Sequence, residues 1–579
     1  MNLILSFKKQ YFIGLLAIGL AACQSDSKNE SVAETPAVET PVVEPPVVET
    51  PAVETPVIEP PVVETPAVET PVVEPPVEHA LWTEFKQQQS HRLLDWSKAG
   101  YKSGYADIPT NPVTHNVVEY GAIANDGKDD RVAVQSAIDA ASVNGGVVFF
   151  PEGNFDFWTG PNGHSLELSA SNVVIRGSGI GKTTLKQQNF HEGNIHFERF
   201  FLINVDSKNK IKGSAVSLIE DAKAHDKRIK VSDTSKVKAG DVILVQMVSE
   251  ENSAGFTSDK IAKKLFSPLT IEPEWTGIAR FIPFELMVTV KEVSPEEKTI
   301  YLEQPLTQDF LLADRARISL IEENLIENVG VEDLTLIGQL ADFNHHRSFE
   351  DNYGWNAIQL KGAKNSWVRN IETDQMGTDV NLVHTGFSTV ENIANNSRGH
   401  SGLLAANSDF NLFKNSYFSG FRKHVISFSG RSAGNVFTNI NNNSGEGGTI
   451  DFHGGGPNNY NLIENSTNLR IASAGAEKGM PHAGQHNTIW NVSAGLLDKI
   501  DDMFTSGYYT YSDYTGLFTG LDLHRLHPKT ILVGITNGDD AITVAGSTAH
   551  RDDEWLYVDS VGKEVTPTSV YYAQKDLVR

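Results

Sequence analysis

The sequence predicts an all-β fold in which short strands wind into a solenoid, and three observations support this class. A motif of two asparagines that bracket three residues recurs at nearly equal spacing. The bracketed residues are mostly β-branched, aromatic or leucine, which favours strands. The period of about two dozen residues is typical of a solenoid built from one β-coil per repeat. The motif begins at Asn411, Asn435, Asn461 and Asn487, with spacings of 24, 26 and 26 residues, and weaker copies begin at Ser366 and Ser388.

Asparagines at fixed places in each coil are expected to lie at its turns, where their side chains can bond the coils above and below. The apolar residues between them should then point into the coil. A leucine-rich repeat has a similar period, but its regularly spaced leucines are missing from this sequence. The strand-forming content favours the β-solenoid over that alternative.

The first 23 residues have the features of a signal peptide. Lys8 and Lys9 precede an apolar run from Tyr11 to Leu20, which is too short for an ordinary transmembrane helix. The run ends in Leu-Ala-Ala-Cys23, which resembles the bacterial lipobox, where the cysteine is lipid-modified. Cys23 is the single cysteine of the chain, so no disulfide can form within it. By resemblance to the sorting rule of such lipoproteins, Gln24 implies the outer membrane, and we expect a lipid-anchored, surface-exposed protein of the bacterial cell envelope.

Residues 24–79 form a spacer rather than a folded domain. From Glu34 a glutamate stands at every fifth position through Glu74, between prolines and valines. Proline fixes φ and removes backbone donors while the like charges repel, so this segment should be an extended stalk. Residues 24–79 contribute −11 to the net charge of −25, and the folded part from residue 80 carries −16. A domain of that sign is not expected to bind nucleic acid, and it can take an acidic substrate only where cations gather locally.

The segment from Asn116 to Phe155 predicts a helix followed by a strand. Asp129 and Asp130 precede a helix with an apolar face at Val134, Ala137, Ile138 and Ala141, and Gly145-Gly146 ends it before a strand over residues 147–150. This segment closely resembles the N-terminal cap of the pectate-lyase superfamily. The resemblance implies a right-handed, single-stranded parallel β-helix with an N-terminal capping helix.

Residues 80–579 are therefore expected to form one β-helix domain with two departures from the repeat. The period disappears between about residues 213 and 323, where alternating segments separated by turns predict an inserted antiparallel β subdomain. Such an insertion could form one wall of a substrate groove. After Asn491 the repeat fades, and residues 496–579 are expected to act as a C-terminal cap that covers the last coil, because an open end would expose a sheet edge.

Residues at the same offset in successive coils should be vertical neighbours. Counted back from the asparagine motifs, three coils contain a charged residue and a histidine two positions apart. Since positions i and i+2 share a face of a strand, each pair should point the same way. The three pairs are Arg398 with His400, Arg422 with His424, and Asp451 with His453, and His482 stands one coil further on. Stacked cations repel one another, so we interpret this column as a functional site rather than a solvated face.

The stretches around His400, Asp451 and His482 also resemble a group of secreted pectate-lyase-like β-helix proteins, which implies action on carbohydrate along the lateral groove. For β-elimination from a uronic-acid polymer, a cation must neutralise the C6 carboxylate, a base must take the C5 proton and an acid must protonate O4. Arg422, helped by Arg398 or Lys423, suits the first role. His424 or His453 suits the second, His400 or His482 the third, and Asp451 could orient a histidine.

Two alternatives remain. A glycoside hydrolase would use Asp451 with Asp374, Asp379 or Glu446 as the second carboxylate, whereas C5 epimerisation shares the first two steps of elimination. A non-catalytic glycan-binding protein would need aromatic platforms, but Trp355, Trp367 and Tyr417 are scattered.

A loop over residues 341–355 should project toward the groove, where His345, His346 and Arg347 could contact substrate. No tight set of oxygen ligands is visible, so no metal ligand is predicted, and Ca²⁺ is implied by resemblance only. The expected partners are an acidic polysaccharide and, through Cys23, a membrane. We expect the protein to be a monomer.

Overall fold

The computed structural model describes residues 78–89, 92–189, 200–248, 260–268, 283–339, 356–445, 448–453, 456–472, 483–495, 497–498, 500–505, 527–538, 542–543 and 556–578. The chain divides into two compact units, Met1–Val73 and Glu74–Arg579, and all of the described residues belong to the second. Cys23 and the stalk expected up to residue 77 lie outside the described residues, as do His345, Arg347 and His482. Within the described part, no helix is long and apolar enough to cross a bilayer.

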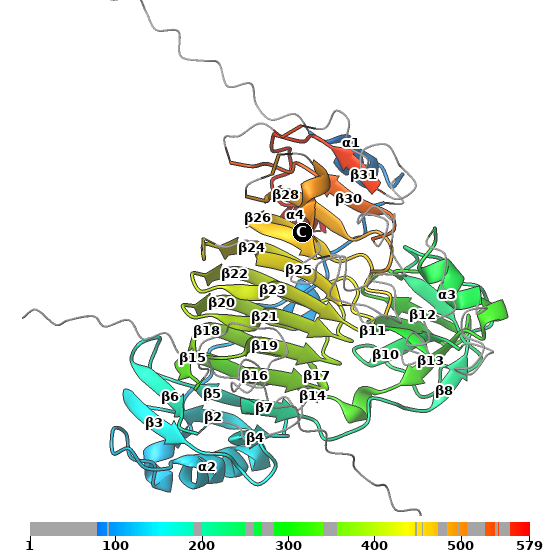
Figure 1. Ribbon diagram of the computed structural model, residues 1–579. Helices are drawn as coiled ribbons and strands as arrows, with labels where there is room; N and C mark the ends of the chain where they lie inside the picture. Colours follow the sequence, from blue (N-terminus) through cyan, green and yellow to red (C-terminus); the bar gives the residue numbers. More distant parts are fainter. Residues whose placement is uncertain are drawn as a thin grey trace, which may run out of the picture. The chain divides into compact units, whose positions relative to one another are not determined.

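Two long parallel sheets form the body of this unit, and successive coils of the chain add one strand to each (Figure 1). Sheet I has 14 strands and sheet II has 9 in the described residues. The order along sheet I is β1 (His115–Asn116), β2 (Gly146–Phe149), β5 (Val173–Arg176), β15 (Gly330–Ile337), β18 (Trp367–Asp374), β20 (Thr389–Asn395), β22 (Leu412–Phe418), β24 (Val436–Asn442), β26 (Leu462–Thr467), β28 (Thr488–Ser493), β30 (Thr530–Val533) and β31 (Leu556–Asp559), with β3 (Gly153–Phe157) and β6 (Thr183–Gln187) beside this path. The order along sheet II is β4 (Leu166–Leu168), β7 (Phe201–Asp206), β16 (Asn356–Lys361), β19 (Thr378–Val383), β21 (Gly399–Ala406), β23 (Arg422–Ser429), β25 (Gly448–His453), β27 (Leu469–Ala472) and β29 (Phe504–Thr505). A short parallel pair, β14 (Ile326–Glu327) and β17 (Ala363–Lys364), lies at a turn.

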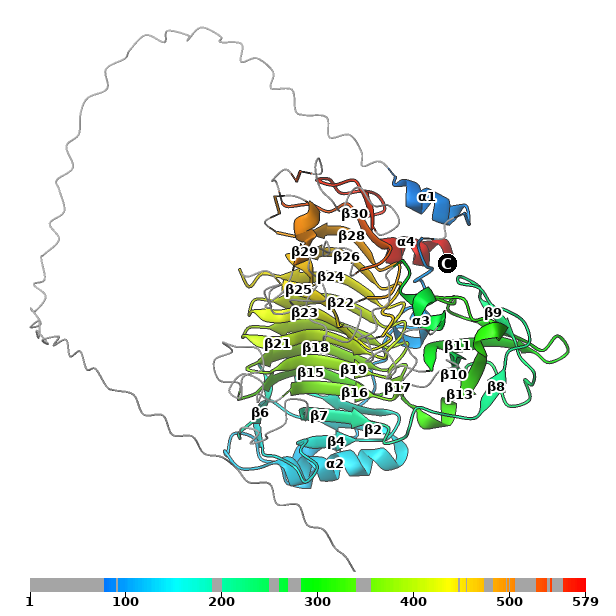
Figure 2. The ribbon, with the colours of Figure 1, turned by 45° about the vertical axis from the view of Figure 1, so that its right-hand side comes forward.

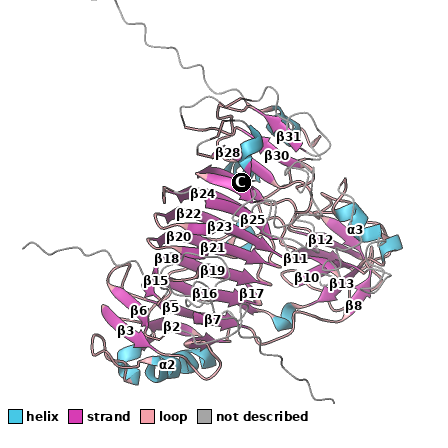
Figure 3. Ribbon diagram, in the orientation of Figure 1, coloured by secondary structure: helices cyan, strands magenta, loops and turns pink. Residues whose placement is uncertain are grey.

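The predicted insertion is a third sheet that is antiparallel throughout. Its order is β8 (Ala215–Ser217), β13 (Arg317–Leu320), β10 (Val242–Met247), β11 (Phe284–Ser294), β12 (Thr299–Leu302) and β9 (Arg228–Lys230). Strands dominate the unit and the helices are few and peripheral (Figure 3). The predicted fold class, a parallel β-helix with an inserted antiparallel subdomain, is confirmed.

The described helices are α1 (Ala80–Lys86), α2 (Arg131–Asn144), α3 (Lys260–Leu265) and α4 (Val570–Val578), together with the 3-10 turns η1 (Tyr101–Gly104), η2 (Val117–Tyr120), η5 (Leu312–Asp314), η6 (Glu322–Asn324) and η7 (Ile500–Met503). Helix α2 packs against β1, β2 and β4, the first strands of the two parallel sheets. Its four predicted apolar residues are all fully buried, and it ends at Gly145, whose φ of 79° lies in the left-handed region. The pattern of this segment was therefore read correctly.

The interior of the solenoid is a column of stacked apolar side chains. Alternate residues of each strand point into one continuous buried cluster. The rings of Phe413 and Phe437 stack at 4.2 Å between centroids, and those of Phe428 and Phe452 stack at 4.9 Å. These spacings match the distance between neighbouring strands, so one coil lies on the next with its side chains in register.

Two asparagine ladders mark the turns, as the repeat predicts. Asn411, Asn435, Asn461 and Asn487 are fully buried. The side-chain oxygen of each of the last three accepts hydrogen bonds from the backbone N–H and the side-chain amide of the preceding one, at 3.0–3.1 Å. The second asparagines of the motifs, such as Asn415 and Asn439, adopt φ near +55°, a conformation that asparagine tolerates better than most residues.

The outer face of sheet I is covered by parts of the chain that the repeat does not foretell. Residues 92–111, which we name the N-terminal strap, run along this face, and Trp96 donates a hydrogen bond from Nε1 to the carbonyl of Tyr460 at 2.7 Å. The strap, the insertion and helix α4 share one apolar cluster with the outward residues of sheet I. Figure 2 shows α4 beside the upper coils of the solenoid.

The expected C-terminal cap is also arranged differently from the prediction. Sheet I continues beyond Asn491 through β30 and β31, so the coil runs into residues 496–579. The final segment then turns back to the side of the sheet, where the buried Glu464 of β26 accepts hydrogen bonds from the Ser569 hydroxyl and, at 2.7 Å, from the Val570 amide. The first turn of α4 is thus capped by a carboxylate from the solenoid.

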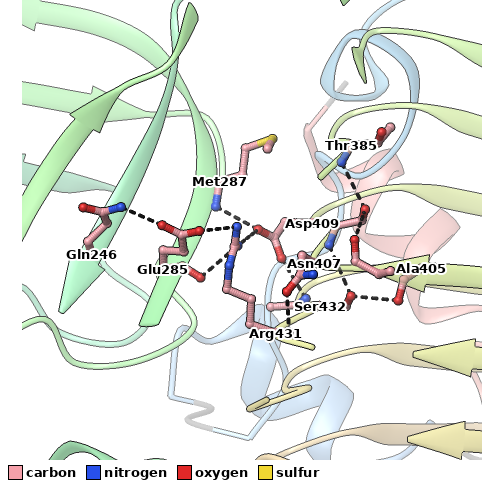
Figure 4. Close-up of polar contacts among 12 residues, drawn as sticks. Gln246, Glu285, Met287, Thr385, Ala405, Asn407, Asp409, Arg431 and Ser432 are labelled. Carbon is pink, nitrogen blue, oxygen red and sulfur yellow. Dashed lines mark hydrogen bonds and ion pairs between the residues drawn. The ribbon is translucent and has the colours of Figure 1, made fainter. Parts of the chain in front are cut away.

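A buried charged cluster joins the insertion to the turn that follows β23 (Figure 4). Arg431 forms ion pairs with Glu285 of β11 at 2.6 Å and with Asp409 at 3.3 Å. Asp409 also accepts a hydrogen bond from the backbone amide of Met287 at 2.8 Å. Burial raises the pKa of Asp409 to about 6, and the arginine beside it opposes that shift. The insertion is therefore fixed to the end of sheet II.

A candidate active site on the second sheet

The candidate site lies on the face of sheet II that points away from the core. Ile450 and Phe452 of β25 belong to the interior cluster, so Asp451 between them points outward. Ile426 and Phe428 of β23 are interior in the same way, which places Ser427 outward beside Asp451 in the ladder. The groups that could carry chemistry are therefore presented by β21, β23 and β25.

His424, Asp451 and His400 come together on this face. The Nε2 atom of His424 lies 3.7 Å from Oδ2 of Asp451, and its Nδ1 atom lies 2.7 Å from the hydroxyl of Thr449. The rings of His400 and His424 lie edge to face, with 5.1 Å between their centroids. The Nδ1 atom of His400 is 2.9 Å from the hydroxyl of Ser401. The site thus contains two imidazoles and a carboxylate in direct sequence.

The hydrogen bonds define which nitrogen of neutral His424 carries the proton. The Thr449 hydroxyl donates to the carbonyl of Lys423 at 2.6 Å. A hydroxyl has one proton, so it must accept at its oxygen from Nδ1–H of His424. The lone pair of the neutral ring then resides on Nε2, the atom that faces Asp451. His424 can accept a proton there, and the carboxylate would stabilise the resulting imidazolium.

Burial strengthens the electrostatics of this pair. His424 is 5% exposed and Asp451 is 3% exposed, whereas His400 is half-buried. Charges in a site shielded from water interact more strongly than charges on an open surface. The more accessible His400 is the better placed of the two histidines to exchange protons with solvent or with a leaving group.

The predicted vertical columns are shifted from those observed. The ladder pairs Gly399 with Arg422 and Ser401 with His424, so Arg398 and His400 are one residue out of step with Arg422 and His424. Asp451 stands opposite Ser427, three residues beyond His424, and the register shifts between His424 and Ile426. His400 and His424 nevertheless lie side by side because they occupy neighbouring strands.

Unequal turns explain the shift. The prediction counted back from the asparagine motifs and so assumed turns of equal length. Five residues separate Ala406 from Asn411, six separate Ser429 from Asn435 and eight separate His453 from Asn461, although Ala406, Ser429 and His453 occupy one row of the ladder. The glycines after His453 therefore lengthen the turn.

The expectation that Arg422 meets the sugar is corrected by its position. Its side chain is fully buried and forms an ion pair with Asp379, which is also fully buried, at 2.7 Å. The same guanidinium donates to the carbonyl of Met376 at 2.6 Å, and any side chain at Gly399 would collide with it. Burial raises the pKa of Asp379 to about 6, against the opposing effect of Arg422. This pair is part of the solenoid interior, which also removes Asp379 as an accessible carboxylate for hydrolysis.

The remaining predicted residues are placed as follows. Arg398 is half-buried, with its guanidinium 4.7 Å from the centre of the Phe421 ring. Lys423 is 4% exposed and lies in β23 between Arg422 and His424. The backbone of His453 ends β25 opposite Ser429, whereas its side chain lies outside the described residues, as does Glu446.

Sequence reasoning missed three polar residues of this face. Thr449 and Ser401 contact the two histidines, and the half-buried Arg470 stands opposite Thr449 in the next coil. Thr449 could have been found as the residue two positions before Asp451, since such residues share a face. Arg470 had no comparable signal because its strand, β27, follows a turn without the asparagine motif. Within the described part, no group of three or more His, Cys, Asp or Glu side chains is arranged to hold a metal ion, so no role is derived for the calcium that the resemblance implies.

Comparison with known proteins agrees with this architecture. Residues 114–240 match the family model described as Rhamnogalacturonase A/epimerase, pectate lyase-like. The chain contains a pectate-lyase-like β-helix. The curated relatives that it matches include the mannuronan C5-epimerase AlgE1 of Azotobacter vinelandii, 38% identical over 77 residues, and alginate lyase 7 of the same organism, 39% identical over 74 residues.

These matches cover 13% and 12% of this chain, and 6% and 9% of the respective relatives. Among solved structures, the tailspike protein gp49 from Pseudomonas phage LKA1 aligns over 75% of this chain and 67% of its own, at 14% identity and a TM-score of 0.43.

Proposed function

We propose that the chain is a polysaccharide-acting enzyme that removes the C5 proton of a uronate residue, and that it completes the reaction as a lyase by β-elimination. The observation that carries this proposal is the linked set of His400, His424 and Asp451, in which Thr449 fixes the tautomer of His424. This set has a base with a carboxylate behind it and a second imidazole within one ring's distance, which are the groups that elimination requires.

In the proposed reaction, Nε2 of neutral His424 takes the C5 proton, and the imidazolium that forms is stabilised by Asp451. The electron pair of the broken C5–H bond forms the C4=C5 double bond as the C4–O4 bond breaks. His400, entering as the imidazolium, gives its proton to O4 of the leaving chain. Negative charge that builds up on the C6 carboxylate must be neutralised by a cation. Arg398 and Arg470, rather than the buried Arg422, are the arginines of this face that suit that role.

C5 epimerisation is the second candidate, because the curated matches include mannuronan C5-epimerases as well as an alginate lyase. It shares the abstraction step but returns a proton to the opposite face of C5 and breaks no glycosidic bond. Hydrolysis fits less well, because Asp451 faces a histidine and Asp379 is held by Arg422.

The test is incubation with a panel of uronate polymers, followed by two measurements. Ultraviolet absorbance of the unsaturated uronate reports elimination, and proton NMR in D₂O reports deuterium at C5 without chain cleavage, which indicates epimerisation. His424→Ala should lower kcat by about 10²–10⁴-fold, the usual contribution of a general base. Full activity in both His424→Ala and Asp451→Asn would refute the proposal.

Thr449→Val provides a finer test, because valine cannot accept a hydrogen bond from Nδ1. We expect a fall in kcat of about tenfold and a changed pH profile, since the ring could then place its proton on Nε2. Thr378→Val is the matched control, since Thr378 precedes Ser401 in the same row of the ladder and has no contact with His424 in the structure. Equal effects of the two substitutions would contradict the assigned tautomer.

We also propose that Cys23 carries a lipid anchor and that residues 24–79 hold the enzyme away from the envelope surface, where it meets its polymer. The support is the lipobox-like end of the apolar run and the proline and glutamate repeat. Metabolic labelling with a radioactive fatty acid should mark the wild-type protein but not Cys23→Ser. Equal labelling of both would contradict the anchor.

A further inference from the structure

A cavity of about 540 Å³ lies on sheet I, the sheet opposite the candidate active site. It is bounded by the N-terminal strap, by the outward residues of β18, β20 and β22, and by helix α4. Its volume falls within the range of sites that bind small molecules, roughly 300–1,000 Å³. The charged and aromatic residues of its lining are Lys98, Tyr101, Tyr105, Asp107, Arg369, Glu391, Lys414, Tyr571 and Lys575.

The walls of the cavity are fixed from both sides. The strap is bonded to the solenoid through Gly100 N–H to the Phe410 carbonyl at 2.9 Å, and through Tyr101 N–H to the Thr389 hydroxyl at 2.9 Å. Helix α4 holds the other side of the strap, because the Tyr571 hydroxyl donates to the Ala99 carbonyl at 2.9 Å. A side chain at position 100 would meet Leu412 at 2.9 Å, so the close approach requires glycine. The cavity is thus part of the folded framework.

The lining gathers positive charge on a protein that is strongly acidic overall. Four cations, Lys98, Arg369, Lys414 and Lys575, face two carboxylates, Asp107 and Glu391. The chain as a whole carries a net charge of −25. An anion would therefore be attracted here more than to the surrounding surface.

Lys98 supplies the second observation. Its side chain is 92% buried by the measure that leaves 8% exposed, and its ammonium lies 3.6 Å from the centre of the Tyr105 ring. In the described part of the chain, no carboxylate forms an ion pair with it. Burial lowers the pKa of Lys98, which means that the ammonium is poorly compensated in this conformation. Lys414, by contrast, is paired with Glu391 at 2.7 Å.

We propose that this cavity binds an anionic saccharide, one or two uronate residues long, separately from the active site. The carboxylate of the sugar would pair with Lys98, and the tyrosine rings would contact the apolar face of the pyranose. The choice of a saccharide rests on the proposed function, whereas the choice of an anion rests on the charges of the lining. Such a site would hold a segment of the polymer while another segment is processed, and so would raise the effective concentration of substrate.

The test measures binding without turnover, by isothermal titration of His424→Ala with trisaccharides of mannuronate and of galacturonate. Maltotriose serves as the neutral probe. Adding Lys98→Met keeps the aliphatic stem but removes the charge, and should weaken uronate binding about tenfold, corresponding to one charge-assisted contact. Lys223→Met, an exposed lysine of the insertion, is the matched control and should leave binding unchanged.

Lys414→Gln provides a second variant if Lys98→Met unfolds, which thermal denaturation would reveal. The proposal is overturned if uronates bind no better than maltotriose, or if folded Lys98→Met binds them as tightly as its parent. In the otherwise wild-type protein, Lys98→Met should retain kcat on trisaccharides but raise KM on long polymers. Failure of the proposed function would instead appear as retained turnover in His424→Ala, so the two outcomes are distinguishable.

Discussion

The buried pair of Arg422 and Asp379 provides a decisive test of how this protein uses its charges. Both side chains are fully buried, and the guanidinium contacts Asp379 at 2.7 Å and the Met376 carbonyl at 2.6 Å. Arg422→Met would leave the Asp379 carboxylate in the interior without its cation. Breaking a buried pair in this way costs about 3–5 kcal/mol of folding stability.

The loss should depend on pH in a defined direction. Burial already raises the pKa of Asp379 to about 6 with Arg422 present, so removal of the arginine raises it further. A group whose folded pKa lies above its unfolded value contributes stability that is lost as the pH rises through the folded pKa. Arg422→Met should therefore be destabilised more at pH 8 than at pH 5.

The assay is urea denaturation at both pH values, followed by far-ultraviolet circular dichroism. The double variant Asp379→Leu with Arg422→Met removes both charges and should recover much of the lost stability. The folded fraction of Arg422→Met should bind uronate trisaccharides as the wild type does. A variant with the wild-type urea midpoint but without substrate binding would refute the structural role and restore the arginine to the groove.

Two further predictions concern the attachments of the solenoid. Burial raises the pKa of Glu464 to about 7, so the stability that its protonated form contributes is complete below about pH 4.5 and is lost as the pH rises through 7. Glu464→Gln should abolish this component, and the thermal midpoints of wild type and variant, compared at pH 5 and pH 8, measure it; an unchanged difference between the two pH values would contradict it. Arg431→Met should cost about 3–5 kcal/mol at the junction with the insertion and leave Asp409 without its cation. Hydrogen exchange should then rise in β10 and β11 with the parallel sheets protected as before, and identical exchange in both strands would show that other contacts hold the insertion.

Local patterns were enough to predict the repeat but not the register of every strand. The asparagine motifs gave the period and the bonded ladders because each asparagine has the same neighbours one coil above and below. The turn after β25 could not be aligned in the same way, because its extra residues change the count without changing the strand. Pairing between coils is set by where strands meet, and that is visible only in three dimensions.

The same limit applies to the site. The sequence brought His400, His424 and Asp451 to attention, and they do lie together. It also selected Arg422, because an arginine two residues before a histidine cannot be distinguished from one that turns inward. What separates them is Asp379, more than forty residues earlier, whose buried carboxylate draws the guanidinium into the interior. The N-terminal strap was missed for a related reason, since no periodic signal marks a segment that follows the outside of a sheet.

The asparagine ladders have a consequence for how this architecture could change over generations. Each asparagine bonds only the coil directly beside it, so no contact in the ladder spans more than one step. Duplication or deletion of one whole coil would therefore leave every remaining step with an equivalent neighbour. Such a chain could lengthen or shorten the surface it offers to a polymer in increments of a single turn, while an insertion of only part of a coil would break the series at once.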